Sequence, residues 1–304
     1  PRMSSPLERT KMLEAYLRKP TDVAMHRDML RERYDTHSDI PSLDRTLVPE
    51  YPGWTQEAPD VVKASDVLSH LGEWETAREM PQLVMIILPS DHTEGLTPDW
   101  CAPRACVADN DLALGRIVEG LSHSRFWPHM AILVVEDDAQ NGVDHIDGHR
   151  TVALAISPYA RRGVVDSTFY AHPGMVKTIE LMLGLPALSI FDLVATDMRA
   201  SFLDAGTPPD LTPYTALVPK QSLTEVNRRV GAITGPHAAE RRQAALASTR
   251  MNFREPDAAP SEALNRMLWR DARGWRTPYP AVRHSLFFPM SLDLADDERD
   301  ERPR

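Results

Sequence analysis

Three short apolar runs, with helix-like segments placed between and after them, constrain the fold of this chain more than any other sequence feature. They are residues 83–88 (LVMIIL), 131–135 (AILVV) and 151–156 (TVALAI). Uninterrupted apolar runs of this length are typical of strands buried on both faces of a parallel sheet. Apolar residues recur at helical spacing in 112–121 and again in 175–183, which Gly184 would end. The order strand, helix, strand, strand, helix predicts an α/β fold with a mostly parallel sheet.

The rest of the chain divides around this α/β core, which the pattern places at 81–205. Residues 1–80 are polar and irregular, with short helices expected at 11–18 and 23–34 and a longer one at 66–79. Residues 206–304 are rich in loops. Helices are expected there at 236–248 and 261–273, followed by a charged, solvated tail.

Charge and composition exclude two classes of protein. Lys and Arg number 34 against 44 Asp and Glu, a formal charge of −10, and the basic residues are scattered, which argues against a protein that binds nucleic-acid backbones. The apolar runs are far shorter than the roughly 20 residues that span a bilayer, so we expect no membrane span. Cys101 and Cys106 are too few for a disulfide scaffold and leave the redox compartment open. No export signal is recognisable at the start of the sequence.

Charged side chains gather directly after two of the predicted strands. Asp91 and His92 follow the first run, and eight of the sixteen residues in 135–150 are Glu, Asp, His or Arg. Carboxylates packed this closely repel one another unless a cation neutralises them. Carboxylate oxygen combined with imidazole nitrogen suits zinc, manganese or iron better than calcium. The alternative interpretation is an acidic surface loop with incidental histidines.

Asp137 and Asp138 are the strongest candidate metal ligands, because the end of a strand is rigid enough to fix the geometry of a metal site. Asp91 and His92 come next. His145 is a candidate ligand or general acid, and the alternative is a loop histidine held by a neighbouring aspartate.

Three further residues each allow a functional and a structural interpretation. Arg150 could bind an anionic group of a substrate, although an ion pair with Asp144 or Asp147 is equally natural. For His149 and His172 a structural role is at least as natural as a functional one.

The segment 134–163, VVEDDAQNGVDHIDGHRTVALAISPYARRG, together with LPSDHTEG at 88–95, resembles the bacterial phosphoesterase family that includes acid phosphatases and phospholipases C. This family belongs to the alkaline phosphatase superfamily, and the similarity extends over roughly residues 66–280. The resemblance implies a three-layer α/β/α fold, a bound divalent metal ion and hydrolysis of phosphate esters through a phosphoenzyme.

Carried over by position, the resemblance implies metal ligands and catalytic groups. Asp137 and Asp138 match the paired acidic metal ligands, and Asp91 with His92 matches an earlier metal or phosphate site. His145 belongs to the downstream Asp-His pair. The resemblance thus implies metal ligands at Asp91, His92, Asp137, Asp138 and His145, with His92 and His145 also catalytic. Arg150 is the candidate substrate-binding residue. Zinc is the first expectation for the ion, with manganese, iron or calcium as alternatives.

One departure from the family pattern changes what we expect of this chain alone. Family members carry an acidic metal-binding segment and a Ser or Thr nucleophile well upstream, and neither is recognisable here. We therefore interpret the sequence as the C-terminal half of a longer periplasmic or secreted phosphoesterase, with weak or no activity without its N-terminal portion. The substrate would be a small-molecule or lipid phosphate ester. The alternative is a degenerate relative, a non-catalytic binding module stabilised by metal.

Overall fold

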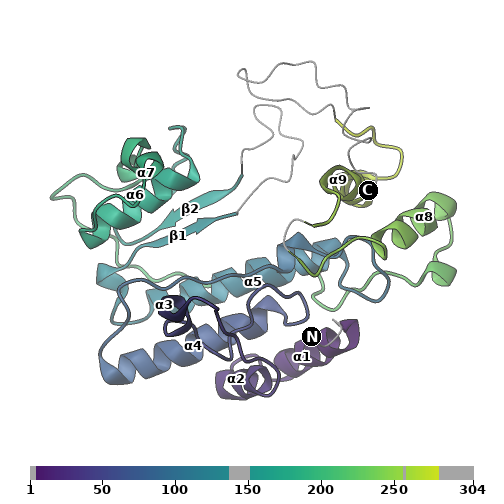
Figure 1. The fold of residues 1–304 in the computed structure, drawn as a ribbon, viewed down its shortest axis with the longest axis horizontal. Coiled ribbons are helices and arrows are strands. Elements are labelled where there is room, and N and C mark those ends of the chain that lie inside the picture. Colours follow the sequence, from purple (N-terminus) through teal and green to yellow (C-terminus); the bar gives the residue numbers. More distant parts are fainter. Residues whose placement is uncertain (1–4, 137–150, 256–257, 281–304) are drawn as a thin grey trace.

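The computed structural model describes residues 5–136, 151–255 and 258–280 (Figure 1). Helices make up most of the regular structure in this part of the chain. The α-helices are α1 Pro6–Arg18, α2 Val23–Arg31, α3 Pro41–Asp44, α4 Asp60–Ala77, α5 Pro103–Ser122, α6 His172–Leu183, α7 Ile190–Val194, α8 Ala238–Ser248 and α9 Ser261–Arg273. Short 3-10 turns are η1 Ser90–His92, η2 Trp127–His129, η3 Arg199–Ser201 and η4 Val230–Ala232, and the strands are β1 Ile132–Val135 and β2 Ala153–Ile156.

The main hydrophobic core lies between helices of the N-terminal half. Helix α4 runs alongside α5 and also packs against α2 and α1 (Figure 1). Met12 and Leu30 are fully buried there, as are Val61 and Val62 at the start of α4. The apolar residues of 112–121 supply the α5 side of this core, so the helical spacing in that segment is confirmed.

The sheet differs from the predicted one. β1 and β2 pair antiparallel, with Ile132 opposite Ile156 and Val135 opposite Ala153, and they form the two-stranded sheet of the described residues. The prediction of a mostly parallel sheet in a three-layer α/β/α fold is therefore wrong. The strands themselves lie where 131–135 and 151–156 predict them, but Val135 and Leu154 are more than a third exposed, so the pair is not covered on both faces.

The apolar run 83–88 does not form a strand. It is extended, and among the described residues it makes no backbone–backbone hydrogen bond. Its side chains at 83–87 are also exposed, Met85 by 88% and Ile87 by 44%, while Leu88 packs against the main core. An apolar run indicates which residues favour burial, but the partner that would cover them is set by contacts distant in sequence, which the run does not encode.

The predicted C-terminal helices agree well with the structure. Helix α9 occupies Ser261–Arg273 as the spacing predicts, and α8 covers most of 236–248. Helix α6 ends at Gly184, whose φ of 68° places it in the left-handed region that glycine adopts without steric cost. Helices α6 and α7 lie next to the β1–β2 hairpin, on the side away from α4 and α5 (Figure 1).

Candidate functional site

Asp91 and His92 lie in η1, a turn that packs against α5. Asn110 of α5 holds this turn, because its Nδ2 donates to the Leu88 carbonyl at 2.7 Å and to Asp91 Oδ1 at 3.2 Å. The sequence predicted these two residues at the end of a buried strand. Here they follow an extended, exposed segment, and their position is set by the hydrogen bonds of α5.

The η1 turn approaches the end of β1. The pKa of Asp91 is raised to about 6, first by burial and second by the negative charge of Glu136, while nearby amides and His92 act in the opposite direction. Glu136 is the first residue after β1 and the first of the acidic run. His172 at the start of α6 places its Nε2 3.1 Å from the Glu136 carbonyl. His172 thus contacts the backbone of Glu136, whose charge acts on Asp91.

His92 has one ring nitrogen engaged and one without a partner. Its Nδ1 lies 3.2 Å from Gln56 Nε2 and 3.2 Å from the Thr93 carbonyl. The ring meets Trp54 edge-on with centroids 4.9 Å apart. Nε2 is buried and has no hydrogen-bond partner within the described chain. When Nδ1 donates to Thr93, Nε2 is a free acceptor, which is the form that binds a metal ion or a proton.

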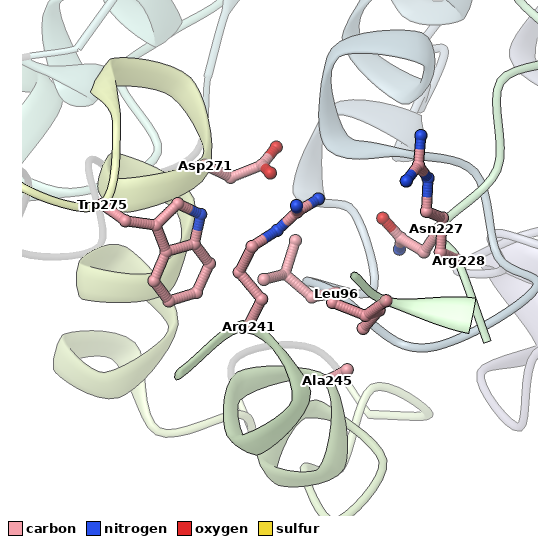
Figure 2. Close-up of a pocket in the computed structure, with 8 residues that line it drawn as sticks. Leu96, Asn227, Arg228, Arg241, Ala245, Asp271 and Trp275 are labelled. Atoms are coloured by element: carbon pink, nitrogen blue, oxygen red, sulfur yellow. The ribbon is translucent and has the colours of Figure 1, made fainter. Parts of the chain in front are cut away.

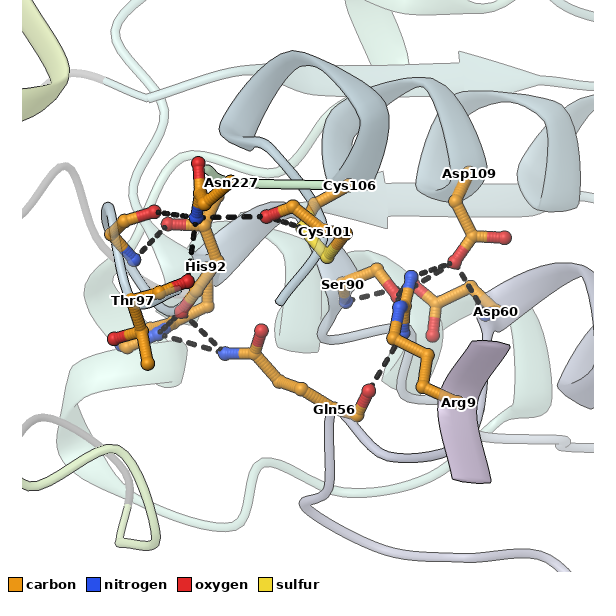
Figure 3. Close-up of a disulfide and its surroundings, with 12 residues drawn as sticks. Arg9, Gln56, Asp60, Ser90, His92, Thr97, Cys101, Cys106, Asp109 and Asn227 are labelled. Atoms are coloured by element: carbon orange, nitrogen blue, oxygen red, sulfur yellow. Dashed lines mark hydrogen bonds and ion pairs between the residues drawn. A yellow bond between two sulfur atoms is a disulfide. The ribbon is translucent and has the colours of Figure 1, made fainter. Parts of the chain in front are cut away.

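A buried charge network holds Ser90, the first residue of η1 (Figure 3). The Asp109 carboxylate accepts hydrogen bonds from Arg9 Nη2 at 2.6 Å, from the Asp60 amide at 2.8 Å, and from Ser90 Oγ at 2.9 Å. Asp60 Oδ2 in turn accepts from the Ser90 amide at 2.8 Å. This network joins α1, α4, α5 and η1, and it therefore positions Asp91 and His92 rather than facing a substrate.

Burial also perturbs the acid–base properties of this network. The pKa of Asp60 is raised to about 6, mainly by burial and also by the charge of Asp109, against an opposing effect of Lys63. Lys63 is itself buried, which lowers the pKa of its ammonium group, and its Nζ donates to the Thr55 carbonyl at 3.0 Å. The network thus holds charges in a desolvated position through their mutual contacts.

A second group of candidate metal ligands lies away from η1, at Glu50, Asp66 and His70. One potential ligand atom of each residue lies within 4.8 Å of the others, so this group could hold a metal ion. The sequence analysis missed it. The one readable signal is that Asp66 and His70 are four residues apart, which places both on one face of α4.

The remaining predicted site residues lie outside the described part of the chain. They are Asp137, Asp138, His145 and Arg150, together with their neighbours Asp144, Asp147 and His149. Of the predicted ligands, the structure therefore positions Asp91 and His92.

Two small cavities lie in the C-terminal half. One of about 50 Å³ is lined by Leu96, Arg241, Asp271 and Trp275 among others (Figure 2). A neighbouring cavity of about 120 Å³ shares Arg241 and Asp271 and adds Arg104. Pockets for small molecules measure roughly 300–1,000 Å³, so these two suit water molecules rather than a substrate. Neither is lined by Asp91 or His92.

Within the described residues, none of the helices combines the length and apolar character needed to cross a lipid bilayer. The chain matches no family model, no curated protein and no solved structure, so its residues and their geometry carry the functional argument alone.

Proposed function

We propose that this chain carries the metal-binding part of a phosphoesterase that hydrolyses small-molecule or lipid phosphate esters. The observation that carries the proposal is the buried pair Asp91 and His92, in which the negative charge of Glu136 acts on the Asp91 carboxyl and His92 Nε2 has no hydrogen-bond partner in the described chain. Asp137 and Asp138 follow Glu136 directly in sequence. A divalent ion among these carboxylates would offset their repulsion.

In this proposal Asp91, His92, Asp137, Asp138 and His145 supply ligands to a divalent ion, with zinc the best match to a mixed oxygen and nitrogen set. His92 Nε2 suits this role because it is buried and without a hydrogen-bond partner in the described chain. The ion would stabilise negative charge on the phosphoryl oxygens and lower the pKa of an attacking hydroxyl or water. Arg150 would bind the phosphate group through its guanidinium.

The proposal includes a Ser or Thr nucleophile from a further segment of the same protein. Ser90, the hydroxyl next to Asp91 in sequence, does not suit the role, because it is fully buried and hydrogen-bonded to Asp109 and Arg9. The disulfide between Cys101 and Cys106 favours a periplasmic or secreted location, since such bonds persist in oxidising compartments.

Metal analysis combined with phosphate binding tests this function. The purified chain, loaded with Zn²⁺ or Mn²⁺, is compared with a double Asp137→Ala, Asp138→Ala variant and with Asp204→Ala, an exposed carboxylate as matched control. We expect the double variant to bind one metal ion fewer per chain than the wild type and to lose the metal-dependent binding of inorganic phosphate, both measured by calorimetry, while the control matches the wild type in both.

Each outcome decides between the two interpretations of the sequence. Equal metal content in the wild type and the double variant would remove the proposed site. The additional ion retained only by the wild type and the control, but without phosphate binding in either, would favour the non-catalytic, metal-stabilised module. Robust turnover of a chromogenic phosphate monoester by the chain alone would refute the external nucleophile.

A further inference from the structure

We propose that Glu50, Asp66 and His70 form a separate binding site for a zinc-type divalent ion, independent of the phosphoesterase site. Asp66 and His70 are one turn apart on α4, and Glu50 lies in the loop before that helix. Asp66 is fully buried and Glu50 is buried. An ion here would tie the loop to the helix.

Asp66 and His70 contribute buried polar atoms that lack hydrogen bonds, whereas Glu50 Oε1 accepts hydrogen bonds from Arg27 and Arg31. Both carboxylate oxygens of Asp66 and the Nε2 of His70 are buried, and none has a hydrogen-bond partner in the described chain. A buried polar atom without a hydrogen bond costs about 1–3 kcal/mol, so such atoms commonly mark a position for a ligand or an ion. Here two of them, Asp66 Oδ2 and His70 Nε2, face each other at 3.8 Å.

The spacing of these atoms suits a tetrahedral ion. His70 Nε2 lies 3.7 Å from Glu50 Oε1 and 3.8 Å from Asp66 Oδ2. Zinc bonds of 2.0–2.2 Å at tetrahedral angles place ligand atoms about 3.4 Å apart. The observed separations therefore need to shorten by a few tenths of an ångström, which side-chain rotation provides.

A neighbouring carboxylate holds His70 in the form that binds metal. His70 Nδ1 lies 3.1 Å from Glu73 Oε2, a contact that favours the tautomer in which Nδ1 carries the hydrogen and donates to Glu73. This leaves the Nε2 lone pair directed at Asp66 and Glu50. A carboxylate behind the imidazole is the usual arrangement around metal-binding histidines, because it orients the ring and raises its basicity.

Arginine side chains compensate only part of the acidic charge. Arg27 Nε lies 2.6 Å from Glu50 Oε1 and 3.4 Å from Asp66 Oδ1, so it covers the side of Asp66 that faces away from His70. Arg31 also reaches Glu50, at 3.1 Å. Three carboxylates thus meet two guanidinium groups, which leaves one formal negative charge to attract a cation. The carboxylates are those of Glu50, Asp66 and Glu73.

The ligand set selects the class of ion. One imidazole nitrogen and two carboxylate oxygens suit zinc or its first-row neighbours, whereas calcium and magnesium prefer oxygen ligands alone. With three protein ligands the fourth tetrahedral position is left for water. We therefore expect Zn²⁺ and Co²⁺ to bind and Ca²⁺ and Mg²⁺ to compete poorly.

Titration of the full chain with Zn²⁺ and Co²⁺ tests this site. His70→Ala and Asp66→Asn should each weaken binding of one ion by at least the ~10–100-fold that follows loss of a supporting partner. His37→Ala is the matched control, because His37 also lies between two aspartates, 3.1 Å from Asp35 and 3.1 Å from Asp44, but on the surface. The control should bind as the wild type does.

Co²⁺ absorption gives a second readout, since a tetrahedral site produces an intense visible band that His70→Ala should lose. Circular dichroism establishes that each variant is folded, and His70→Ala, at a partly exposed position, remains decisive if Asp66→Asn unfolds. Unchanged binding in His70→Ala, equal loss in His37→Ala, or displacement of Zn²⁺ by equimolar Ca²⁺ would each overturn the proposal. The double variant at 137 and 138 should retain this ion, so failure here and failure of the phosphoesterase site are distinguishable.

Discussion

Removing the Asp109 carboxylate should destabilise the chain more than any surface substitution. The Arg9 side chain is 4% exposed and that of Asp109 fully buried, and their ion pair measures 2.6 Å. In Asp109→Ala the guanidinium would remain buried without its counter-charge, at a cost of about 3–5 kcal/mol. The amides of Asp60 and Val61 at the start of α4 would lose their acceptor as well. This loss is a large fraction of the roughly 5–15 kcal/mol that stabilises a typical domain.

Urea unfolding followed by tryptophan fluorescence measures this effect as a change in the free energy of unfolding. Lys11→Ala is the control, because its ion pair with Glu8 is exposed and should contribute less than about 1 kcal/mol. The double variant Arg9→Met, Asp109→Ala also removes the buried guanidinium, so its loss in free energy of unfolding should be smaller than the sum of the losses in the two single variants. A loss below about 1 kcal/mol in Asp109→Ala, or strict additivity in the double variant, would refute this reasoning.

Three further predictions concern pH, covalent structure and packing. Burial raises the pKa of the Asp60 carboxyl from 3.8 to about 6, so the contribution of this group to stability is present at low pH and is lost as the pH rises through about 6. Asp60→Asn should abolish this pH dependence in urea unfolding across the same range, and a variant with the pH profile of the wild type would contradict the prediction. Reducing the Cys101–Cys106 disulfide should lower the free energy of unfolding by about 2 kcal/mol, the value for a small closed loop, and no change on adding reductant would count against it. Gly174→Ala should cost about 1–3 kcal/mol in the same assay, because a Cβ there would collide with the Thr196 carbonyl, and a neutral effect would show that α6 shifts freely.

Local features of the fold were predictable from the sequence, and the arrangement of the strands was not. Helix α9 and the Gly184 end of α6 follow from apolar spacing and from the backbone preference of glycine, which depend on neighbouring residues only. The pairing of β1 with β2 depends on contacts between residues distant in sequence. Because 83–88 stays outside the sheet, a pattern that predicts three strands yields two in the described chain.

The candidate site residues also divide into those that local sequence predicts and those that only the fold brings together. The one-turn spacing of Asp66 and His70 on α4 is readable from the sequence, but the approach of Glu50 requires the folded loop. The Arg9–Asp109 pair joins residues 100 positions apart, and no local pattern encodes it. Asp91 and His92 were proposed from charge clustering, and their role as ligands stays a prediction, whereas the strand predicted to precede them does not form.

Within the described residues, the backbone at 83–86 has no backbone hydrogen-bond partner, so we expect this segment to open before the helices do. Amides without a backbone partner exchange with deuterated solvent almost at once, whereas those of a helix inside the core exchange only through larger openings. Mass spectrometry after brief labelling should therefore find 83–86 deuterated first and the buried first turns of α4 last. An exposed apolar segment that is also quick to exchange is where a protease would cut and where neighbouring molecules would first adhere.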